Sequence, residues 1–281
     1  MATRSQRNQT EGGEDRVAHV AGGLQTRFDG WGQPNAIGHR RGLGRPRCPA
    51  AGFSLLELLV VLTVTLMLTT LLLPTLALLR ENAYQVICSS NLKQTGLSTV
   101  MYADEHNGWL PHSVFGEPGG NKQEMMAAHT GEEPANEHWE GLGWLYAQRY
   151  SDVPAVFYCP SHTGEHPFER YHALYPQYRR LPAAGSPIYT NYHYAGDVDW
   201  VTNSRRRLEE GHALVIATDG LRTVRDFNHR TGLNVLRGDG SVIWRDNIFR
   251  RLESLLPLGG IDESDLAEEY SEMWTIIQSH N

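Results

Sequence analysis

Glu57 is the one ionisable side chain in an apolar run that covers residues 53–79. A membrane core is crossed by about 20 consecutive apolar residues in a helix, so this run is long enough to span a bilayer. An ionised carboxylate inside such a helix costs roughly 2.5 kcal/mol or more, and residues of this kind usually mark a function and a partner. The chemistry open to Glu57 is therefore a charge pair in a low-dielectric environment, where the attraction is much stronger than in water.

A second candidate constellation lies near the C-terminus, where nine residues separate His229 from Asp239-Gly240. A catalytic pair would require His229 and Asp239 to touch. The apolar segment 233–237 would hold them about 16 Å apart at roughly 3.3 Å per extended residue. Asp-Gly is also a preferred pair for a tight hairpin turn. We therefore predict a turn at Asp239-Gly240 and a structural, hydrogen-bonding role for His229.

The elements that must position these residues begin with one long helix, predicted over residues 53–106 and about 80 Å long at 1.5 Å per residue. Beyond the apolar run, the pattern predicts one apolar stripe, with Ile87, Leu97 and Met101 beside it. The stripe itself follows every fourth residue: Tyr84, Cys88, Leu92, Gly96 and Val100. Asn107-Gly108 should end the helix, and Pro74 should kink or locally unwind it.

The remaining pattern predicts a small antiparallel sheet. Residues 188–194 and 213–218 alternate as strands do, and 233–237 and 241–245 should form a hairpin. We also predict a strand end at 154–160, an exposed excursion over 161–187, and a C-terminal helix that packs on the sheet, starting at Asp262 or Ser264. The sum is an α+β fold in which a long N-terminal helix packs on a small antiparallel sheet.

Charge divides the chain at the apolar run. Residues 1–52 hold eight arginines and four carboxylates, a net charge of +4, which leaves −11 for residues 53–281 because the whole chain carries −7. We interpret 1–52 as a basic, disordered leader, 53–79 as the transmembrane helix, 80–110 as its amphipathic continuation and 111–281 as an exported globular domain. Basic residues before the run predict a cytoplasmic N-terminus, and an acidic exported domain argues against nucleic acid as its partner.

The N-terminal pattern resembles that of type IV prepilins and of the pseudopilins of type II secretion. It consists of Gly52, then Phe53, then Glu57, followed by an unbroken apolar stretch. The resemblance implies a pilin-like fold and a cut between Gly52 and Phe53 by a prepilin peptidase, which also methylates the new amino group. It further implies that Glu57 pairs with the Phe53 amine of a neighbouring subunit, and that the chain sits in the cytoplasmic (inner) membrane with its C-terminal domain exported.

Two further stretches resemble a large bacterial group of prepilin-like proteins. One is RENAYQVICSSNLKQTGLSTVMYADEHNGWLP, after the apolar run, and the other is the H-x9-D-G signature formed by His229, Asp239 and Gly240. Together they imply a structural subunit that assembles with other pilin or pseudopilin subunits into a pilus or a secretion pseudopilus.

Removal of the leader would take Cys48 with it and leave Cys88 and Cys159 in an oxidising exported compartment. A bond between them would close about 70 residues and contribute about 4 kcal/mol by the loop-entropy estimate. Two buried free thiols are the alternative. We favour the disulfide, which would attach the long helix to the sheet.

Metal binding has weaker support, although the chain contains 13 histidines. Cys159-x2-His162-x3-His166 has ligand-like spacing but departs from established zinc patterns. Some major pseudopilins bind calcium, and three aspartates here could supply oxygen ligands: Asp197, Asp199 and Asp219. No regular loop spacing accompanies them, so we expect solvated loops and no bound cofactor.

Other classes of protein account for fewer of these features. The run is too long for an ordinary secretory signal, and a plain signal anchor needs neither Gly52 nor Glu57. A non-polymerising membrane-anchored domain that binds a ligand, glycan or metal would leave Glu57 unexplained. An anchored hydrolase using His229 ranks last, because the chain has no G-x-S-x-G, phosphate-binding glycine loop or H-E-x-x-H. We therefore expect no enzymatic activity.

Overall fold

The computed structural model describes residues 52–181, 185–199, 202, 204–210, 214–229, 231–246, 249–260 and 266–279. The fold described below is that of the unit Ser54–Asn281. The predicted disorder of the leader lies outside the described residues.

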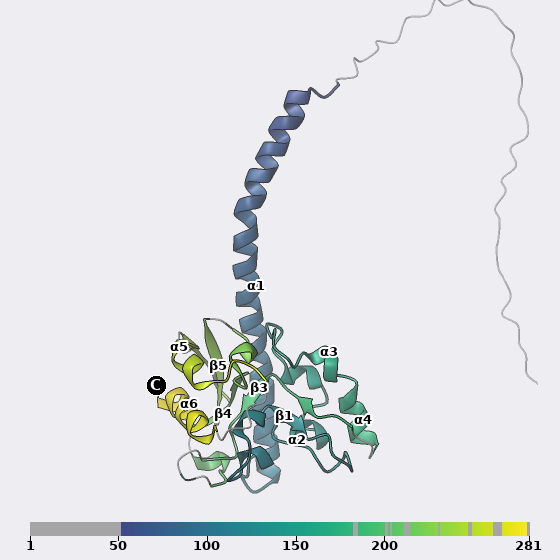
Figure 1. Cartoon of the computed structure of the whole chain (residues 1–281). Helices are drawn as coiled ribbons and strands as arrows, with labels where there is room; N and C mark the ends of the chain where they lie inside the picture. The colour runs from purple at the N-terminus through teal and green to yellow at the C-terminus, as the bar shows by residue number, and fades with distance from the viewer. Residues whose placement is uncertain are drawn as a thin grey trace, which may run out of the picture. The chain divides into compact units, whose positions relative to one another are not determined.

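Ser54–Asn281 contains a long N-terminal helix followed by a mixture of short helices and strands (Figure 1). The α-helices are α1 (Leu55–Glu105), α2 (Gly143–Ala147), α3 (Phe168–Tyr171), α4 (Leu174–Arg180), α5 (Phe249–Leu252) and α6 (Ala267–Ser279). The strands are β1 (Ala127–His129), β2 (Ile188–Tyr189), β3 (Tyr192–Tyr194), β4 (Val215–Asp219), β5 (Gly232–Arg237) and β6 (Val242–Asp246). Short 3₁₀ helices cover Val114–Gly116, Lys122–Glu124, Pro154–Phe157, Leu208–Glu210, Val224–Asp226 and Glu253–Leu255.

α1 is a single helix of 51 residues, which confirms the long helix that the apolar pattern predicts. It ends where Asn107 and Gly108 take positive φ values of 56° and 82°, and the Gly108 N–H donates to the carbonyl of Ala103 at 2.8 Å. A left-handed residue here satisfies carbonyls that the last turn leaves unpaired. The expected local unwinding at Pro74 is not seen, because α1 is helical through this residue, and Figure 1 shows it as a gently curved rod.

The packed face of α1 differs from the predicted stripe. Its buried residues are Cys88, Leu92, Thr95, Gly96, Ser98, Thr99, Tyr102 and Ala103. Val100 is exposed, and so are Leu97 and Met101. A spacing of four drifts around a helix of 3.6 residues per turn, so the predicted line leaves the packed face. Burial of Thr95 and Thr99 on that face costs little free energy, because their hydroxyls donate hydrogen bonds to the helix carbonyls four residues earlier.

The central sheet has the strand order β3-β4-β5-β6, and every neighbouring pair is antiparallel. β5 and β6 pair from Gly232 opposite Asp246 to Leu236 opposite Val242. The connecting turn contains Gly240 at φ 77°, which confirms the predicted hairpin. β1 and β2 form a separate antiparallel pair.

Helices cover both faces of this sheet, as alternate residues of β5 show. Leu236 belongs to a buried cluster with Cys88 and Leu92 of α1. Leu233 and Val235 belong to a second cluster with four side chains of α6: Tyr270, Met273, Trp274 and Ile277. Successive strand residues point to opposite faces, so the sheet lies between α1 and α6. The α+β arrangement is confirmed, and the C-terminal helix packs on the sheet as predicted, while its predicted caps lie outside the described residues.

Two local predictions are wrong. Residues 154–157 form a 3₁₀ helix instead of a strand end, because Pro154 is pre-set for the first turn of a helix. Residues 161–187 are not simply an exposed excursion, since α3 and α4 bury Tyr171, Tyr175 and Tyr178. Their rings pack among other aromatics while the hydroxyls keep polar partners, as in the 2.9 Å bond from Tyr178 to the Ser186 carbonyl.

The contact between α1 and β5 generates the first prediction. A Cβ at Gly96 would stand 2.7 Å from Leu236 Cδ1, which is itself fully buried. Gly96→Leu should therefore lower the free energy of unfolding by about 1–3 kcal/mol through overpacking. Gln94→Leu adds the same side chain at an exposed position of the same helix and should stay within about 0.5 kcal/mol of the wild type. Denaturant unfolding in detergent measures both; equal stabilities would contradict this packing.

Candidate functional site

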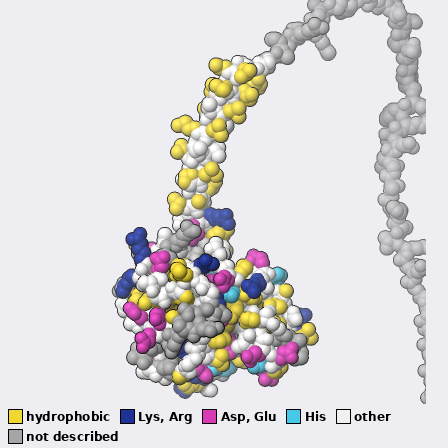
Figure 2. All heavy atoms as spheres, viewed as in Figure 1, with side chains coloured by type: hydrophobic (Ala, Val, Ile, Leu, Met, Phe, Trp, Pro, Cys, Tyr) yellow, Lys and Arg dark blue, Asp and Glu magenta, His cyan; other side chains and the backbone are white. Residues whose placement is uncertain are grey.

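The N-terminal half of α1 is exposed along its length. Figure 2 shows apolar side chains on every visible side of it, whereas charged side chains gather on the globular part. The large apolar residues from Phe53 to Leu79 are each at least half exposed. Within the described part of the chain, α1 is the one helix long and apolar enough to cross a membrane. This surface requires lipid or protein to cover it.

Glu57 lies at the start of that surface. Ser54 is the N-cap residue of α1, and its backbone N–H donates to Glu57 Oε2 over a long 3.4 Å. Glu57 thus occupies the position at which a glutamate caps a helix start. A carboxylate offers about four acceptor sites, so this contact leaves capacity for a second partner. The neighbouring Phe53 is 82 % exposed.

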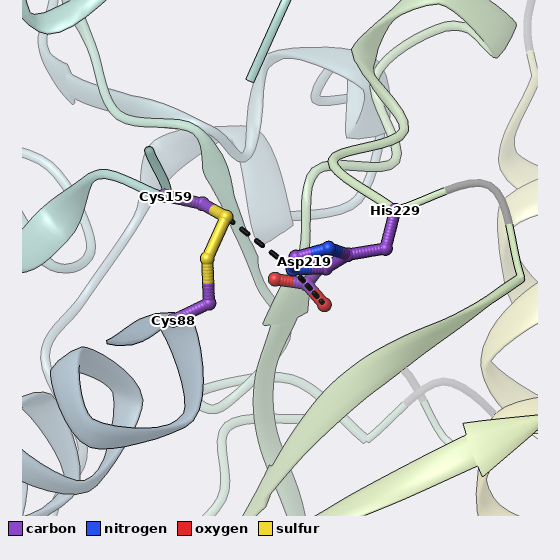
Figure 3. A group of neighbouring side chains, drawn as sticks. All are labelled: Cys88, Cys159, Asp219 and His229. Carbon is purple, nitrogen blue, oxygen red and sulfur yellow. Dashed lines mark hydrogen bonds and ion pairs between the residues drawn. A yellow bond between two sulfur atoms is a disulfide. The ribbon is translucent and has the colours of Figure 1, made fainter. Parts of the chain in front are cut away.

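A buried polar cluster lies where α1 meets the globular part (Figure 3). Cys88 of α1 and Cys159, in the loop after the 3₁₀ helix Pro154–Phe157, form a disulfide with Cα atoms 5.0 Å apart. This is the bond that the sequence analysis favoured. It joins α1 to a segment 71 residues further along the chain.

His229 lies beside this disulfide and is almost fully buried. Its Nδ1 hydrogen-bonds with Glu81 Oε1 of α1 at 2.6 Å, and its Nε2 is 3.4 Å from Cys159 Sγ. Glu81 and Cys88 are two helical turns apart and so share one face of α1. The structure thus shows a hydrogen bond of His229, with Glu81 as the partner. Asp239 lies in the turn beyond β5, where it accepts from the Ser241 N–H at 2.9 Å.

Asp219, at the end of β4, completes the cluster. Its Oδ2 is 4.0 Å from His229 Nε2 and accepts from the backbone N–H and the side-chain amide of Asn234. Its Oδ1 accepts from Asn228 Nδ2 at 3.4 Å. Burial raises the pKa of Asp219, whereas the charge of His229 and these hydrogen bonds act to lower it. A buried carboxylate of this kind requires donors or a cation.

Glu81 was not among the residues predicted from sequence, and Asp219 was predicted only as a calcium candidate. The sequence contains a feature that could have identified each residue. Glu81 is the first acid after the apolar run, and Asp219 is the polar residue that ends an apolar strand. The other two calcium candidates have partners elsewhere, since Asp197 accepts from the Ser113 N–H at 3.0 Å and Asp199 from the Thr202 N–H at 2.7 Å.

The histidines of the Cys159-x2-His162-x3-His166 spacing turn to other partners. His162 Nδ1 contacts Asn228 Oδ1 at 2.8 Å, and His166 Nδ1 contacts the Tyr171 hydroxyl at 2.7 Å. Burial lowers the pKa of His166 to about 3, so this imidazole is neutral at physiological pH. The spacing therefore does not bring its three residues to one point.

Comparison with known proteins yields one match. A family model described as the prokaryotic N-terminal methylation motif matches residues 47–73. No curated protein and no solved structure matches the chain. The match supports a prepilin-type or pseudopilin-type protein with a membrane anchor, and the H-x9-D-G signature stays a resemblance.

The Cys88–Cys159 bond generates the second prediction. Replacement of both cysteines by alanine should lower the free energy of unfolding by about 4 kcal/mol, because the unfolded chain regains the freedom of a 71-residue loop. Denaturant unfolding with a metal chelator present, with and without reductant, measures this loss. The wild type should respond to reductant and the double variant should not. A wild type indifferent to reductant would show that the bond does not stabilise the fold.

Proposed function

Because the chain carries the N-terminal methylation motif of prepilin-type and pseudopilin-type proteins, we propose that it is a structural subunit of a pilus or secretion pseudopilus. A prepilin peptidase cuts between Gly52 and Phe53, and the mature chain assembles through α1. The observation that carries the proposal is the exposed apolar half of α1, with Glu57 as its single carboxylate. The role is structural rather than catalytic.

The first stage is insertion in the cytoplasmic membrane. The 27 residues from Phe53 to Leu79 extend about 40 Å as a helix, enough for the hydrocarbon core and part of the headgroup region. The arginines of residues 1–52 stay on the cytoplasmic side under the positive-inside rule. Arg80 and Glu81, the first charges after the run, stand at the opposite surface, so the globular domain faces outward.

The second stage transfers α1 from lipid to a helical bundle. Apolar side chains would then pack against α1 of neighbouring subunits instead of lipid tails. The exposed apolar residues of its second half support this step: Val86, Ile87, Leu97, Val100 and Met101. They point away from the domain's own core, on the side of α1 that neighbouring subunits would cover.

Glu57 sets the register of the bundle. In a low-dielectric environment, its carboxylate pairs with the ammonium group of Phe53 on the next subunit, and either charge left alone there is costly. The long contact with Ser54 leaves the carboxylate able to take this partner. One charge pair per interface thus fixes the axial step between subunits that are otherwise held by non-directional apolar contacts.

The processing step generates the third prediction. Mass spectrometry of the membrane-extracted protein should find a mature N-terminus at Phe53, with a methylated amine, when the prepilin peptidase is present. Cells that lack the peptidase are the control and should retain the leader. An intact leader in both samples would reject processing and leave a membrane-anchored domain that does not polymerise.

The charge pair generates the fourth prediction. Glu57→Gln keeps an oxygen that can cap the helix but removes the charge, so it should insert in the membrane normally and fail to assemble. An unpaired buried ammonium costs about 3–5 kcal/mol, and each 1.4 kcal/mol is tenfold, so sheared filament yield should fall by roughly 100-fold or more.

Glu57→Ala, which removes both the cap and the charge, should assemble as poorly as Glu57→Gln. If Glu57 acted only as a cap, the glutamine variant would assemble like the wild type while the alanine variant would not. Normal filament yield with glutamine would therefore reject the charge pair, and equal membrane insertion of both variants controls for expression.

A further inference from the structure

The buried cluster in Figure 3 contains more chemistry than a disulfide needs. Cys88, Cys159, Asp219 and His229 each direct a ligand atom to one point, and these atoms all lie within 4.8 Å of one another. All four side chains are buried. We propose that they bind one zinc ion when the cysteines are reduced, so that the cluster exists as either a disulfide or a metal site.

The donor set is one that zinc prefers. Two thiolates, an imidazole nitrogen and a carboxylate oxygen are all established zinc ligands, and four of them complete a tetrahedral structural site. With ordinary bond lengths, a tetrahedron places its sulfur and nitrogen about 3.6 Å apart and its nitrogen and oxygen about 3.4 Å apart. His229 Nε2 lies 3.4 Å from Cys159 Sγ and 4.0 Å from Asp219 Oδ2, so the nitrogen is already close to both of these distances.

The surroundings of the cluster match the outer shell of a metal site. A histidine that binds a metal with one ring nitrogen usually donates the other N–H to a carboxylate or carbonyl. Glu81 Oε1 accepts from His229 Nδ1 at 2.6 Å, which directs the other nitrogen, Nε2, at the sulfur atoms. Asn234 and Asn228 hold the Asp219 carboxylate through three hydrogen bonds. Both ligands are therefore oriented before an ion arrives.

A disulfide alone does not account for Asp219. A disulfide is uncharged and offers the buried carboxylate no compensating charge, so Asp219 depends on the hydrogen bonds from Asn228 and Asn234. A zinc ion at the centre of the cluster would stabilise the carboxylate and both thiolates together.

Conversion of the disulfide form to the zinc form requires a two-electron reductant, and a dithiol supplies both electrons. The Cys88–Cys159 bond takes up two electrons and two protons and becomes two thiols, while the dithiol becomes a disulfide. Zinc then displaces the two thiol protons to solvent. The sulfurs must separate to about 3.8 Å to share one zinc ion. Rotation about the Cα–Cβ bonds of the two cysteines, whose Cα atoms are 5.0 Å apart, would supply this movement.

The ion has a route to the cluster from the surface. Cys159 lines a surface pocket of about 350 Å³ together with Asn91, Tyr158 and Asn191. Glu81 is 45 % exposed at its side chain, so its contact with His229 connects the cluster to solvent. A carboxylate at this position also attracts a divalent cation.

The test uses the full-length processed chain in detergent, stripped of metal with a chelator. A phosphine reduces the disulfide with water as the oxygen source and leaves no competing thiol. Zinc is then titrated against a chromophoric chelator, and bound metal is counted by mass spectrometry. The reduced chain should bind one zinc ion per chain, the oxidised chain none. Cobalt in place of zinc should give the sulfur-to-metal absorption of thiolate ligation.

Variants locate the site. His229→Gln and Asp219→Asn should each weaken zinc binding at least tenfold, and Glu81→Gln, which changes only the outer shell, by about 10- to 100-fold. His166→Gln changes a buried histidine whose Nδ1 contacts the Tyr171 hydroxyl, outside the cluster and its outer shell, and should bind zinc like the wild type. Circular dichroism checks the fold of each variant, and Glu81→Gln decides the question if a ligand variant fails to fold.

Two outcomes would overturn the proposal. One is a reduced wild-type chain that binds no zinc at micromolar concentrations. The other is zinc binding that persists at full strength in Glu81→Gln and in a folded His229→Gln or Asp219→Asn. In either case the cluster holds a disulfide only.

Discussion

The continuity of α1 through two different environments is the constraint on which the remaining structure depends. Its first half exposes large apolar side chains in every direction, while one face of its second half is buried in the globular part. A helix satisfies its own backbone hydrogen bonds and so can pass from lipid to protein without a break. The globular domain has to attach to one face of this rod and leave its other faces uncovered.

The domain meets that requirement with small and polar residues on α1. Gly96 lets the helix approach Leu236 of β5, and Thr95 and Thr99 return their hydroxyls to helix carbonyls. The sheet behind them is covered on its far face by α6. The apolar residues of α1 that a core would normally bury, such as Leu97 and Met101, instead face outward. In a filament these would be the residues that contact other subunits.

The polar cluster lies at the point where the two environments meet. Glu81 and Cys88, two turns apart on one face of α1, bind His229 and Cys159 respectively. Both links connect α1, just beyond its apolar half, to segments that are distant in the sequence. A site that exchanges a disulfide for a metal ion would keep this junction closed under both oxidising and reducing conditions.

The sequence by itself determined the long helix, its apolar half, the hairpin at Asp239-Gly240 and the place of Glu57 as the single charge in the apolar half. Each of these depends on hydrophobic periodicity, turn chemistry or charge within a short stretch of chain, where neighbours in sequence are neighbours in space. The strand end predicted near Pro154 was wrong because this proline begins a 3₁₀ helix. The exposed excursion predicted over 161–187 was wrong because the tyrosines of α3 and α4 are buried among aromatic rings from other segments.

Only the tertiary structure decided which face of α1 is packed and which residues meet around His229. A stripe of apolar residues shows that a helix has a buried side. It does not show which small or polar residues of the helix are also buried where a sheet packs closely against it. Glu81 and His229 are separated by 148 residues, and Asp219 comes from another strand. Their proximity follows from the order of β4 and β5 in the sheet and from the way α1 crosses it, and no local pattern records either.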